Sequence, residues 1–228
     1  MVTSDQNKRL VNFTYIVSHN IRSHVANISG LMTIMDINNE VHRDTYYGLI
    51  EQSVKNLDET IQNLNEIISI QTNVNLNKSY VPLRQKLVQT FHNITGLIQE
   101  SDAHIANKVP HEARVKVVPA YIDSILINLL TNAIKYRSHE RRLQIEINYN
   151  EVEDYKVLSV KDNGLGIDLE KYGDKLFGMY KTFHNNSDAK GLGLFITKTQ
   201  VEAMNGKIQV ESEVGEGSTF KVFFYEKD

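Results

Sequence analysis

The sequence of 228 residues contains no cysteine, so disulfides and cysteine-based zinc sites are excluded. It also has little excess charge, with 25 Lys and Arg against 28 Asp and Glu, which gives a net charge of -3. This balance gives no electrostatic reason to expect nucleic acid or an anionic membrane as the main partner. No apolar run approaches the roughly 20 residues that span a bilayer, and no signal peptide is visible.

The composition that is present, 41% hydrophobic and 23% charged, is typical of a folded globular protein of one large or two small domains. The histidines have no metal-ligand spacing, so no histidine metal site is expected. A helical pattern begins directly after the first four residues. We therefore expect the chain to be a piece of a longer protein.

The first part of the sequence has the apolar spacing of two long helices. Between about Gln6 and Ile37, and again from Ile50 to Ile68, apolar positions recur at steps of three and four, which predicts heptad seams. A short break at 38–40 makes the pair an antiparallel hairpin. Because one hairpin cannot bury both stripes well, we predict a homodimer with a four-helix bundle. The seam positions are Leu10, Phe13 or Thr14, Val17, Ile21, His24, Ile28, Leu31 and Met35, then Ile50, Val54, Leu57, Ile61, Leu64 and Ile68.

The heptads stop at 73–79, where Asn and Ser are dense, and we predict two domains there, 1–76 and 77–228. Beyond this boundary helical and strand patterns alternate. The order predicts an α+β fold in which a mixed sheet carries helices on one face. Helices are expected at 87–100, at 121–136 and after Gly193, and strands at 114–118, 143–149, 156–161, 207–212 and 219–225.

Two glycine-rich turns stand in the second part, one at 162–167 and one at 190–194. Asp162 directly precedes a Gly-x-Gly turn, where a carboxylate can accept a hydrogen bond from a ligand's amino group while the backbone passes close by. The second turn leads into a helical stretch, and the free N–H groups of a helix N-terminus bind phosphate. Each turn alone is weak evidence, but the pair predicts a nucleotide pocket.

The predicted helix 121–136 carries Asn128 and Asn132 four residues apart, on one face and among apolar neighbours. Asparagine is a poor helix former, and a buried amide without a partner is costly. The pair therefore fits a polar ligand such as a hydrated Mg²⁺ on a nucleotide, with Lys135 placed to meet a phosphate. A structural role, in which both amides bind local backbone or water, is equally open.

His19 lies between the seam positions Val17 and Ile21, so its side chain is predicted to face solvent. A solvated imidazole is largely neutral at pH 7 and can act as a nucleophile. Most exposed histidines have no such role, so the position alone is weak evidence. His24 falls on the seam, where a structural role in the bundle is expected.

Together these segments resemble the catalytic core of a sensor histidine kinase from two-component signalling, over essentially the whole chain. The resemblance implies a Bergerat-type ATP-binding fold, ATP and Mg²⁺ as cofactors, a homodimer and the receiver domain of a response regulator as partner. It implies a cytoplasmic location for this part of the protein. It gives no reason to expect nucleic acid as a partner or direct contact with a membrane. The matching boxes occur in the family's order: phospho-acceptor box 18–22, N box 128–136, first glycine box 162–166, F box 177–183, second glycine box 191–194 and terminal glycine box 215–220.

The resemblance also implies roles for individual residues. His19 would accept the γ-phosphoryl group of ATP and pass it to an aspartate of the regulator. Asp162 would bind the adenine amino group, Asn132 would ligate Mg²⁺, and 173–190 would form a lid. The other nucleotide-binding positions would be Asn128, Lys135, Tyr136, Gly164, Gly166, Ile167, Tyr180, Lys190, Gly191, Leu192, Gly193, Leu194 and Thr219, and Asn20, Arg22 and Ser23 would flank the acceptor.

Three positions depart from the family pattern or from related ATPases. Asn20 stands where an acid usually takes the imidazole proton, which leaves slow transfer or an ATP-binding scaffold open. Ser23 stands where Thr or Asn usually positions water, so phosphatase activity also stays open. The fold is shared with ATPases that hydrolyse ATP with a glutamate at the position of Asn128. An amide cannot deprotonate water, which favours transfer to histidine over hydrolysis.

Overall fold

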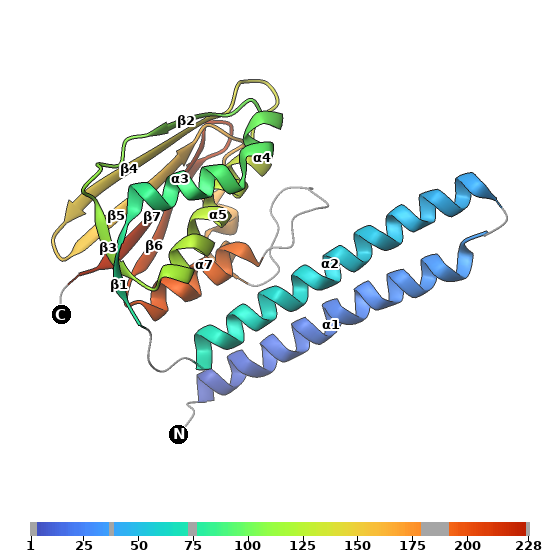
Figure 1. Ribbon diagram of the computed structural model, residues 1–228. Coiled ribbons are helices and arrows are strands. Elements are labelled where there is room, and N and C mark those ends of the chain that lie inside the picture. The colour runs from blue at the N-terminus through green and yellow to red at the C-terminus, as the bar shows by residue number, and fades with distance from the viewer. Residues whose placement is uncertain (1–3, 37–38, 73–76, 179–191, 227–228) are drawn as a thin grey trace. The chain divides into compact units, whose positions relative to one another are not determined.

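The computed structural model describes residues 4–36, 39–72, 77–178 and 192–226 (Figure 1). The chain divides into two compact units, Met1–Gln71 and Thr72–Asp228. Residues 73–76 of the predicted linker lie outside the described ranges, and regular structure resumes at Ser79, inside the stretch that the sequence analysis assigned to the linker.

Unit 1 is a helical hairpin of α1 (Ser4–Ile34) and α2 (Glu40–Thr72), as predicted (Figure 1). The face that α2 turns toward α1 differs from the predicted seam, because it carries Ser53 and Thr60, which are 5% and 2% exposed. The apolar seam positions Val54 and Ile61 are instead 50% and 40% exposed. No helix in the described ranges is long and apolar enough to cross a membrane.

Two polar contacts explain why hydroxyl side chains are accepted between the helices. The Asn27 amide donates to Ser53 Oγ at 2.8 Å, and the Nε2 of His24 lies 3.5 Å from Thr60 Oγ1. Both hydroxyls also donate to carbonyls one turn earlier in α2. Since buried polar groups are tolerated when they are hydrogen-bonded, this interface is polar without being unfavourable. The expected structural role of His24 agrees with its contact across the hairpin.

Unit 2 contains a five-stranded sheet in the order β2-β4-β5-β7-β6 and a separate two-stranded sheet of β1 and β3. The pairing of β2 with β4 is parallel and the other pairings in the large sheet are antiparallel, so the sheet is mixed, as predicted. The strands are β1 (Ser79–Pro82), β2 (His104–Asn107), β3 (Arg114–Val117), β4 (Gln144–Val152), β5 (Tyr155–Asp162), β6 (Lys207–Glu213) and β7 (Gly217–Tyr225).

Helices α3, α5 and α7 lie together on one face of the large sheet (Figure 1). Helix α5 is the centre of the core, and eight of its side chains are buried. It starts with Pro119 at its first position, where the ring fits the helical φ and its missing N–H would be unpaired in any residue. The helices of unit 2 are α3 (Leu83–Asn93), α4 (Thr95–Glu100), α5 (Pro119–Lys135), α6 (Leu169–Tyr172), the 3₁₀ turn η1 (Gly173–Lys175) and α7 (Gly193–Ala203).

The α+β class with an N-terminal hairpin and a mixed sheet is therefore confirmed, with local differences. The helix predicted at 87–100 begins at Leu83 and is interrupted at Ile94, whose φ of -108° is not helical. Strands β1 and β2 were not predicted because each has only four residues and their neighbours are polar.

Two glycines close to the end of β5 have positive φ but different surroundings. Gly217 has φ +124°, and a Cβ there would collide with the backbone carbonyl of Asp162. Gly215 has φ +87°, and a Cβ there would have no neighbour within 4 Å. Gly217 therefore requires glycine because of both its positive φ and the nearby carbonyl, whereas Gly215 requires it only because of its positive φ.

We expect Gly217→Ala to lower the free energy of unfolding by about 1–3 kcal/mol more than Gly215→Ala, because only the first adds a backbone collision to the strained φ. Urea unfolding of both variants measures the difference. Equal losses would show that the approach of Gly217 to Asp162 has no energetic weight.

Candidate functional site

Asp162, the last residue of β5, has a buried carboxylate that is only 8% exposed. Its Oδ1 accepts the N–H of Gly164 at 2.8 Å and the N–H of Ser218 at 3.3 Å. Burial raises the pKa of Asp162, and these two backbone N–H groups partly offset the rise because they favour the charged form. Both bonds use one oxygen, and the second carboxylate oxygen, which accepts no hydrogen bond from the part of the chain that the structure describes, can accept one from a ligand.

The glycine loop after Asp162 is fixed to the C-terminal end of α5. The N–H of Leu165 donates to the carbonyl of Tyr136 at 2.9 Å, and a Cβ on Gly164 would lie 2.5 Å from that carbonyl oxygen. Further along the loop, Ile167 donates its N–H to Ser212 Oγ on β6 at 2.8 Å. The predicted residues Gly164 and Ile167 therefore lie in a loop that is held at both ends.

The two asparagines of α5 form a short chain of hydrogen bonds. The Asn128 Nδ2 donates to Thr197 Oγ1 of α7 at 2.7 Å, and Asn132 Nδ2 donates to Asn128 Oδ1 at 3.3 Å. Asn128 therefore has a structural role, which the sequence analysis had left open beside a ligand role. With its NH₂ group engaged, Asn132 presents its Oδ1, which accepts no hydrogen bond from the described residues, as a candidate metal ligand.

The start of α7 lies against Asn128. A Cβ on Gly193, the first residue of α7, would collide with Asn128 Oδ1. Leu192 before it is buried, and no side chain among the described residues caps the helix. Leu194 follows, half-buried in the first turn. The N–H groups at the start of α7 therefore lie close to Asn128.

The other predicted nucleotide-binding positions are distributed around this core. Lys135 and Tyr136 end α5 and are half-buried, and burial raises the pKa of the Tyr136 hydroxyl. Thr219 is half-buried on β7, and Gly166 is buried in the first glycine loop with φ +69°. Tyr180, Lys190 and Gly191, together with most of the predicted lid, lie outside the described residues.

Lys135 also lines a cavity of about 360 Å³ between α4 and α5. This position places it on the side of α5 that faces α4, so the sequence prediction that it meets a phosphate is not tested by the described residues. The lining residues are Leu97, Glu100, Ser101, Thr131, Ile134, Lys135 and Arg137.

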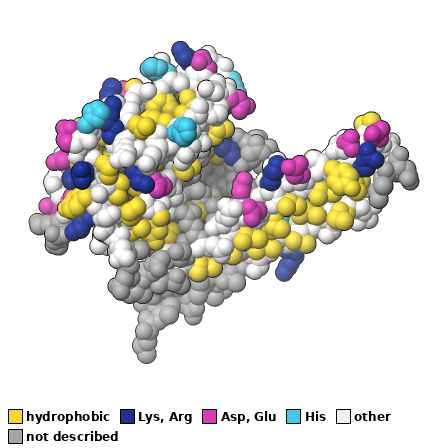
Figure 2. All heavy atoms as spheres, in the orientation of Figure 1, with side chains coloured by type: hydrophobic (Ala, Val, Ile, Leu, Met, Phe, Trp, Pro, Cys, Tyr) yellow, Lys and Arg dark blue, Asp and Glu magenta, His cyan; other side chains and the backbone are white. Residues whose placement is uncertain are grey.

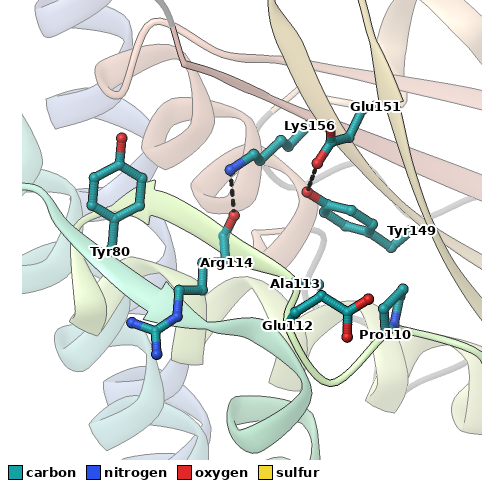
Figure 3. A pocket seen from close by; sticks show the side chains of 8 residues that line it. All are labelled: Tyr80, Pro110, Glu112, Ala113, Arg114, Tyr149, Glu151 and Lys156. Atoms are coloured by element: carbon teal, nitrogen blue, oxygen red, sulfur yellow. Dashed lines mark hydrogen bonds between the residues drawn. The ribbon is translucent and has the colours of Figure 1, made fainter.

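A second cavity, of about 330 Å³, has Lys156 in its wall, near the start of β5, whereas Asp162 ends that strand (Figure 3). Lys156 in its wall donates to the carbonyl of Arg114 at 2.8 Å and pairs with Glu226 at 3.1 Å, while the Tyr149 hydroxyl donates to Glu151 at 2.8 Å. Lys156 precedes Asp162 by six residues on β5, a separation of about 20 Å along a strand. This cavity is therefore distinct from the site around Asp162.

The hairpin of unit 1 carries the predicted acceptor. His19 is exposed on α1, as the sequence analysis expected, and Arg22 and Ser23 are exposed beside it. Asn20 is half-buried and lies one turn before His24, the residue that contacts Thr60 of α2. The imidazole of His19 is therefore accessible on the outer surface of the hairpin.

Comparison with known proteins agrees with this geometry. Residues 118–228 match the family described as histidine kinase-, DNA gyrase B- and HSP90-like ATPase. The chain is 27% identical over 230 residues to cyanobacterial phytochrome A of Nostoc, covering 94% of this chain and 28% of that protein. It is 25% identical over 219 residues to the methanogenesis regulatory histidine kinase FilI of Methanothrix harundinacea, covering 93% and 24%. Residues 118–228 thus match an ATP-binding domain family, and nearly the whole chain is similar to the catalytic core of sensor histidine kinases.

Solved structures show the same fold. The histidine kinase ThkA, solved in complex with the response regulator protein TrrA, aligns with a TM-score of 0.75 at 21% identity, over 97% of this chain and 64% of that one. The histidine kinase AdeS of Acinetobacter baumannii aligns with a TM-score of 0.73 at 18% identity, over 92% and 98%. The chain spans only about a quarter of the length of the two curated relatives.

Asp162→Asn is expected to raise the free energy of unfolding at pH 7. Because the folded-state pKa of Asp162 is raised, the folded state binds more protons than the unfolded state between the ordinary Asp value and the folded value. Stability from this group therefore falls as pH rises through that window, and the amide removes this loss.

Urea unfolding between pH 4 and pH 8 measures the effect as a gap between variant and wild type that widens with pH. Glu140→Gln, at an exposed carboxyl, is the control and should show no such trend. A gap for Asp162→Asn that is constant over this pH range would contradict the prediction.

Proposed function

We propose that the chain is an ATP-dependent protein-histidine kinase core. Unit 2 binds ATP, His19 accepts its γ-phosphoryl group, and the phosphohistidine then phosphorylates an aspartate in the receiver domain of a response regulator. The observation that carries the proposal is the carboxylate of Asp162, which is buried and fixed by two N–H groups yet has one oxygen left for a ligand's amino group. Adenine carries such a group.

The nucleotide would lie between the end of α5, the first glycine loop and the start of α7. Asp162 binds the adenine amino group, Tyr136 and Thr219 border the base and ribose, and the N–H groups at Gly193 bind phosphate oxygens. Lys135 is assigned to the phosphates, together with Lys190 and Gly191 beyond the described residues. In this proposal the base lies at one end of the site and the phosphates lie at the other.

The amide oxygen of Asn132 fits a magnesium ligand, because Mg²⁺ prefers oxygen donors and keeps several waters when it is bound with nucleotide phosphates. When bound, the ion neutralises charge on the phosphates. Asn128 fixes the orientation of Asn132 through their hydrogen bond. The chain's own contribution is therefore one positioned oxygen rather than a complete set of ligands.

The phosphoryl step needs little covalent help from the protein. A ring nitrogen of His19 forms a bond to the γ-phosphorus while the bond to the bridging β–γ oxygen breaks, and ADP leaves. Asn20 cannot take the proton that the imidazole loses, so solvent water accepts it. Transfer to a receiver aspartate then breaks the phosphorus–nitrogen bond and forms an acyl phosphate.

Hydrolysis of ATP by water is the main alternative, and Asn128 argues against it. Its amide is committed to Thr197 and Asn132, and it has no basic group that could deprotonate water. The exposed hydroxyl of Ser23 can instead hold a water near a phosphorylated regulator, so we assign a phosphatase activity toward the regulator to this position. An ATP-binding scaffold without transfer is the second alternative, which Asn20 favours because its amide cannot take the imidazole proton.

The two domains of this proposal are 1–76 for dimerisation and histidine phosphotransfer and 77–228 for ATP binding. Because ATP and response regulators are found in the cytoplasm, the proposal places this part of the protein there. Neither nucleic acid nor a membrane is needed as a partner.

Transfer is tested by labelling the full chain with ATP that carries a γ-phosphate label. We expect an acid-labile, base-stable label that is lost in His19→Gln and retained in His42→Gln, a variant at another exposed histidine. Steady phosphate release without label on the protein would support the hydrolase, and neither signal would support the scaffold. Mixing His19→Gln with Asn132→Asp shows whether one subunit phosphorylates the other, because only transfer between subunits restores the label.

The homodimer is proposed from an apolar stripe on the hairpin. Hydrophobic side chains gather along its surface in Figure 2. Four of them on α2 recur every seven residues, and an exposed row of this spacing forms one face of a helix that a second copy can cover. These are Tyr47, Val54, Ile61 and Ile68, which are 55%, 50%, 40% and 44% exposed.

Ile61→Glu is expected to shift the protein from dimer to monomer at micromolar concentration, because it buries a charge without a partner in the interface. Gln52→Glu adds the same charge on the opposite side of α2 and should leave the dimer intact. Analytical ultracentrifugation separates the two states, and a well-folded wild-type monomer would refute the dimer.

A further inference from the structure

Arg141, in the connection between α5 and β4, binds three main-chain carbonyls although its side chain is exposed. Its Nε donates to the carbonyl of Asn163 at 2.7 Å, and one Nη donates to the carbonyl of Gly164 at 2.8 Å and to that of Gly215. Arginine is suited to this task because its rigid guanidinium presents several donors in one plane.

The three carbonyls belong to two different loops. Asn163 and Gly164 lie in the first glycine loop after Asp162, while Gly215 lies in the turn between β6 and β7. The loops also bind each other directly, since the N–H of Gly215 donates to the carbonyl of Leu165 at 2.8 Å. Arg141 is therefore a clamp across the junction of these two loops.

The carboxylate of Asp162 is oriented by the same two loops. One of its N–H donors, Gly164, lies in the first glycine loop, and the other, Ser218, lies in β7 immediately after the turn. Both donors bind Oδ1, so a shift of one loop against the other rotates the carboxylate and moves the oxygen that remains for a ligand. The orientation of Asp162 thus depends on a junction that Arg141 holds.

We propose that Arg141 is a positioning residue that determines nucleobase selectivity. By fixing the two loops, it sets the direction of the free oxygen of Asp162, and so the preference for a base with an exocyclic amino group over a base with a carbonyl at that position. The inference rests on the proposed adenine contact of Asp162. It predicts that loss of Arg141 weakens binding of ATP more than binding of a nucleotide that differs from ATP only by a carbonyl in place of the amino group of the base.

The neighbouring Arg142 supplies a matched control. Its guanidinium binds the carbonyl of Asp102 at 3.1 Å and the Asp102 carboxylate at 2.8 Å, in the segment between α4 and β2. It has the same charge and is also exposed, but neither contact of its side chain belongs to the first glycine loop or to the β6–β7 turn. Its main-chain carbonyl accepts from Asn163 Nδ2 at 3.0 Å, a contact that does not involve the side chain. Any effect of charge alone on phosphate binding is therefore shared by both residues.

The test compares the affinities of the full chain for ATP and for inosine triphosphate, whose base has a carbonyl in place of the amino group, by calorimetry. Wild type is expected to prefer ATP. Arg141→Gln should reduce that preference by about tenfold, through weaker ATP binding with inosine triphosphate binding little changed, and Arg142→Gln should keep it. Arg141→Lys, which can still donate to part of the junction, should restore some of it.

Other outcomes overturn the inference in distinguishable ways. An unchanged preference in Arg141→Gln, or an equal loss of affinity for both nucleotides with a lower melting temperature, would reduce Arg141 to a structural residue. If Arg141→Gln does not fold, Arg141→Lys is measured in its place. A preference for ATP as large as that of wild type, with both nucleotides bound more weakly by Arg141→Lys, would also make Arg141 a structural residue. A wild type that does not discriminate, with Asp162→Asn behaving identically, would instead refute the adenine contact of the proposed function.

Discussion

The hydrogen bonds to one oxygen of Asp162 are the interaction on which the site in unit 2 depends. They come from two segments that are distant in sequence, Gly164 in the first glycine loop and Ser218 near the start of β7, and their acceptor is a buried carboxylate. Burial alone disfavours the ionised form, which the raised pKa of this carboxyl reflects. Burial of an ionised carboxylate lowers the stability of the folded protein. Such groups are common in binding and active sites, where a hydrogen bond from a ligand can offset the cost.

The other end of the site follows the same logic with neutral groups. Asn128 engages both ends of its amide inside the protein, with Thr197 of α7 and with Asn132. The position of Asn132 is thereby coupled to the start of α7, next to Gly193. The oxygen that we propose as a metal ligand and the N–H groups of a helix start are thus joined by one side chain, which keeps them in a fixed relation to each other.

Much of this arrangement could be predicted from the sequence, because strong local signals mark it. The apolar run of α5, the acidic residue before a Gly-x-Gly turn and the exposed His19 need only periodicity and composition. Arg141 could not be found, since it stands in a run of charged residues and its partners are backbone carbonyls that only the folded loops bring together. Nor could the pairing of Thr60 with His24, because apolar spacing indicates which face is hydrophobic and carries no information on hydroxyl contacts.

The polar contacts inside the hairpin limit how its helices can move. Sliding α1 by one turn along α2 would separate Asn27 from Ser53 and His24 from Thr60 at the same time, and each lost hydrogen bond costs about 0.5–1.5 kcal/mol. A purely aliphatic seam would accept such a slide with little penalty. Longitudinal displacement is therefore disfavoured, whereas bending or rotation that keeps both pairs together remains inexpensive for this hairpin.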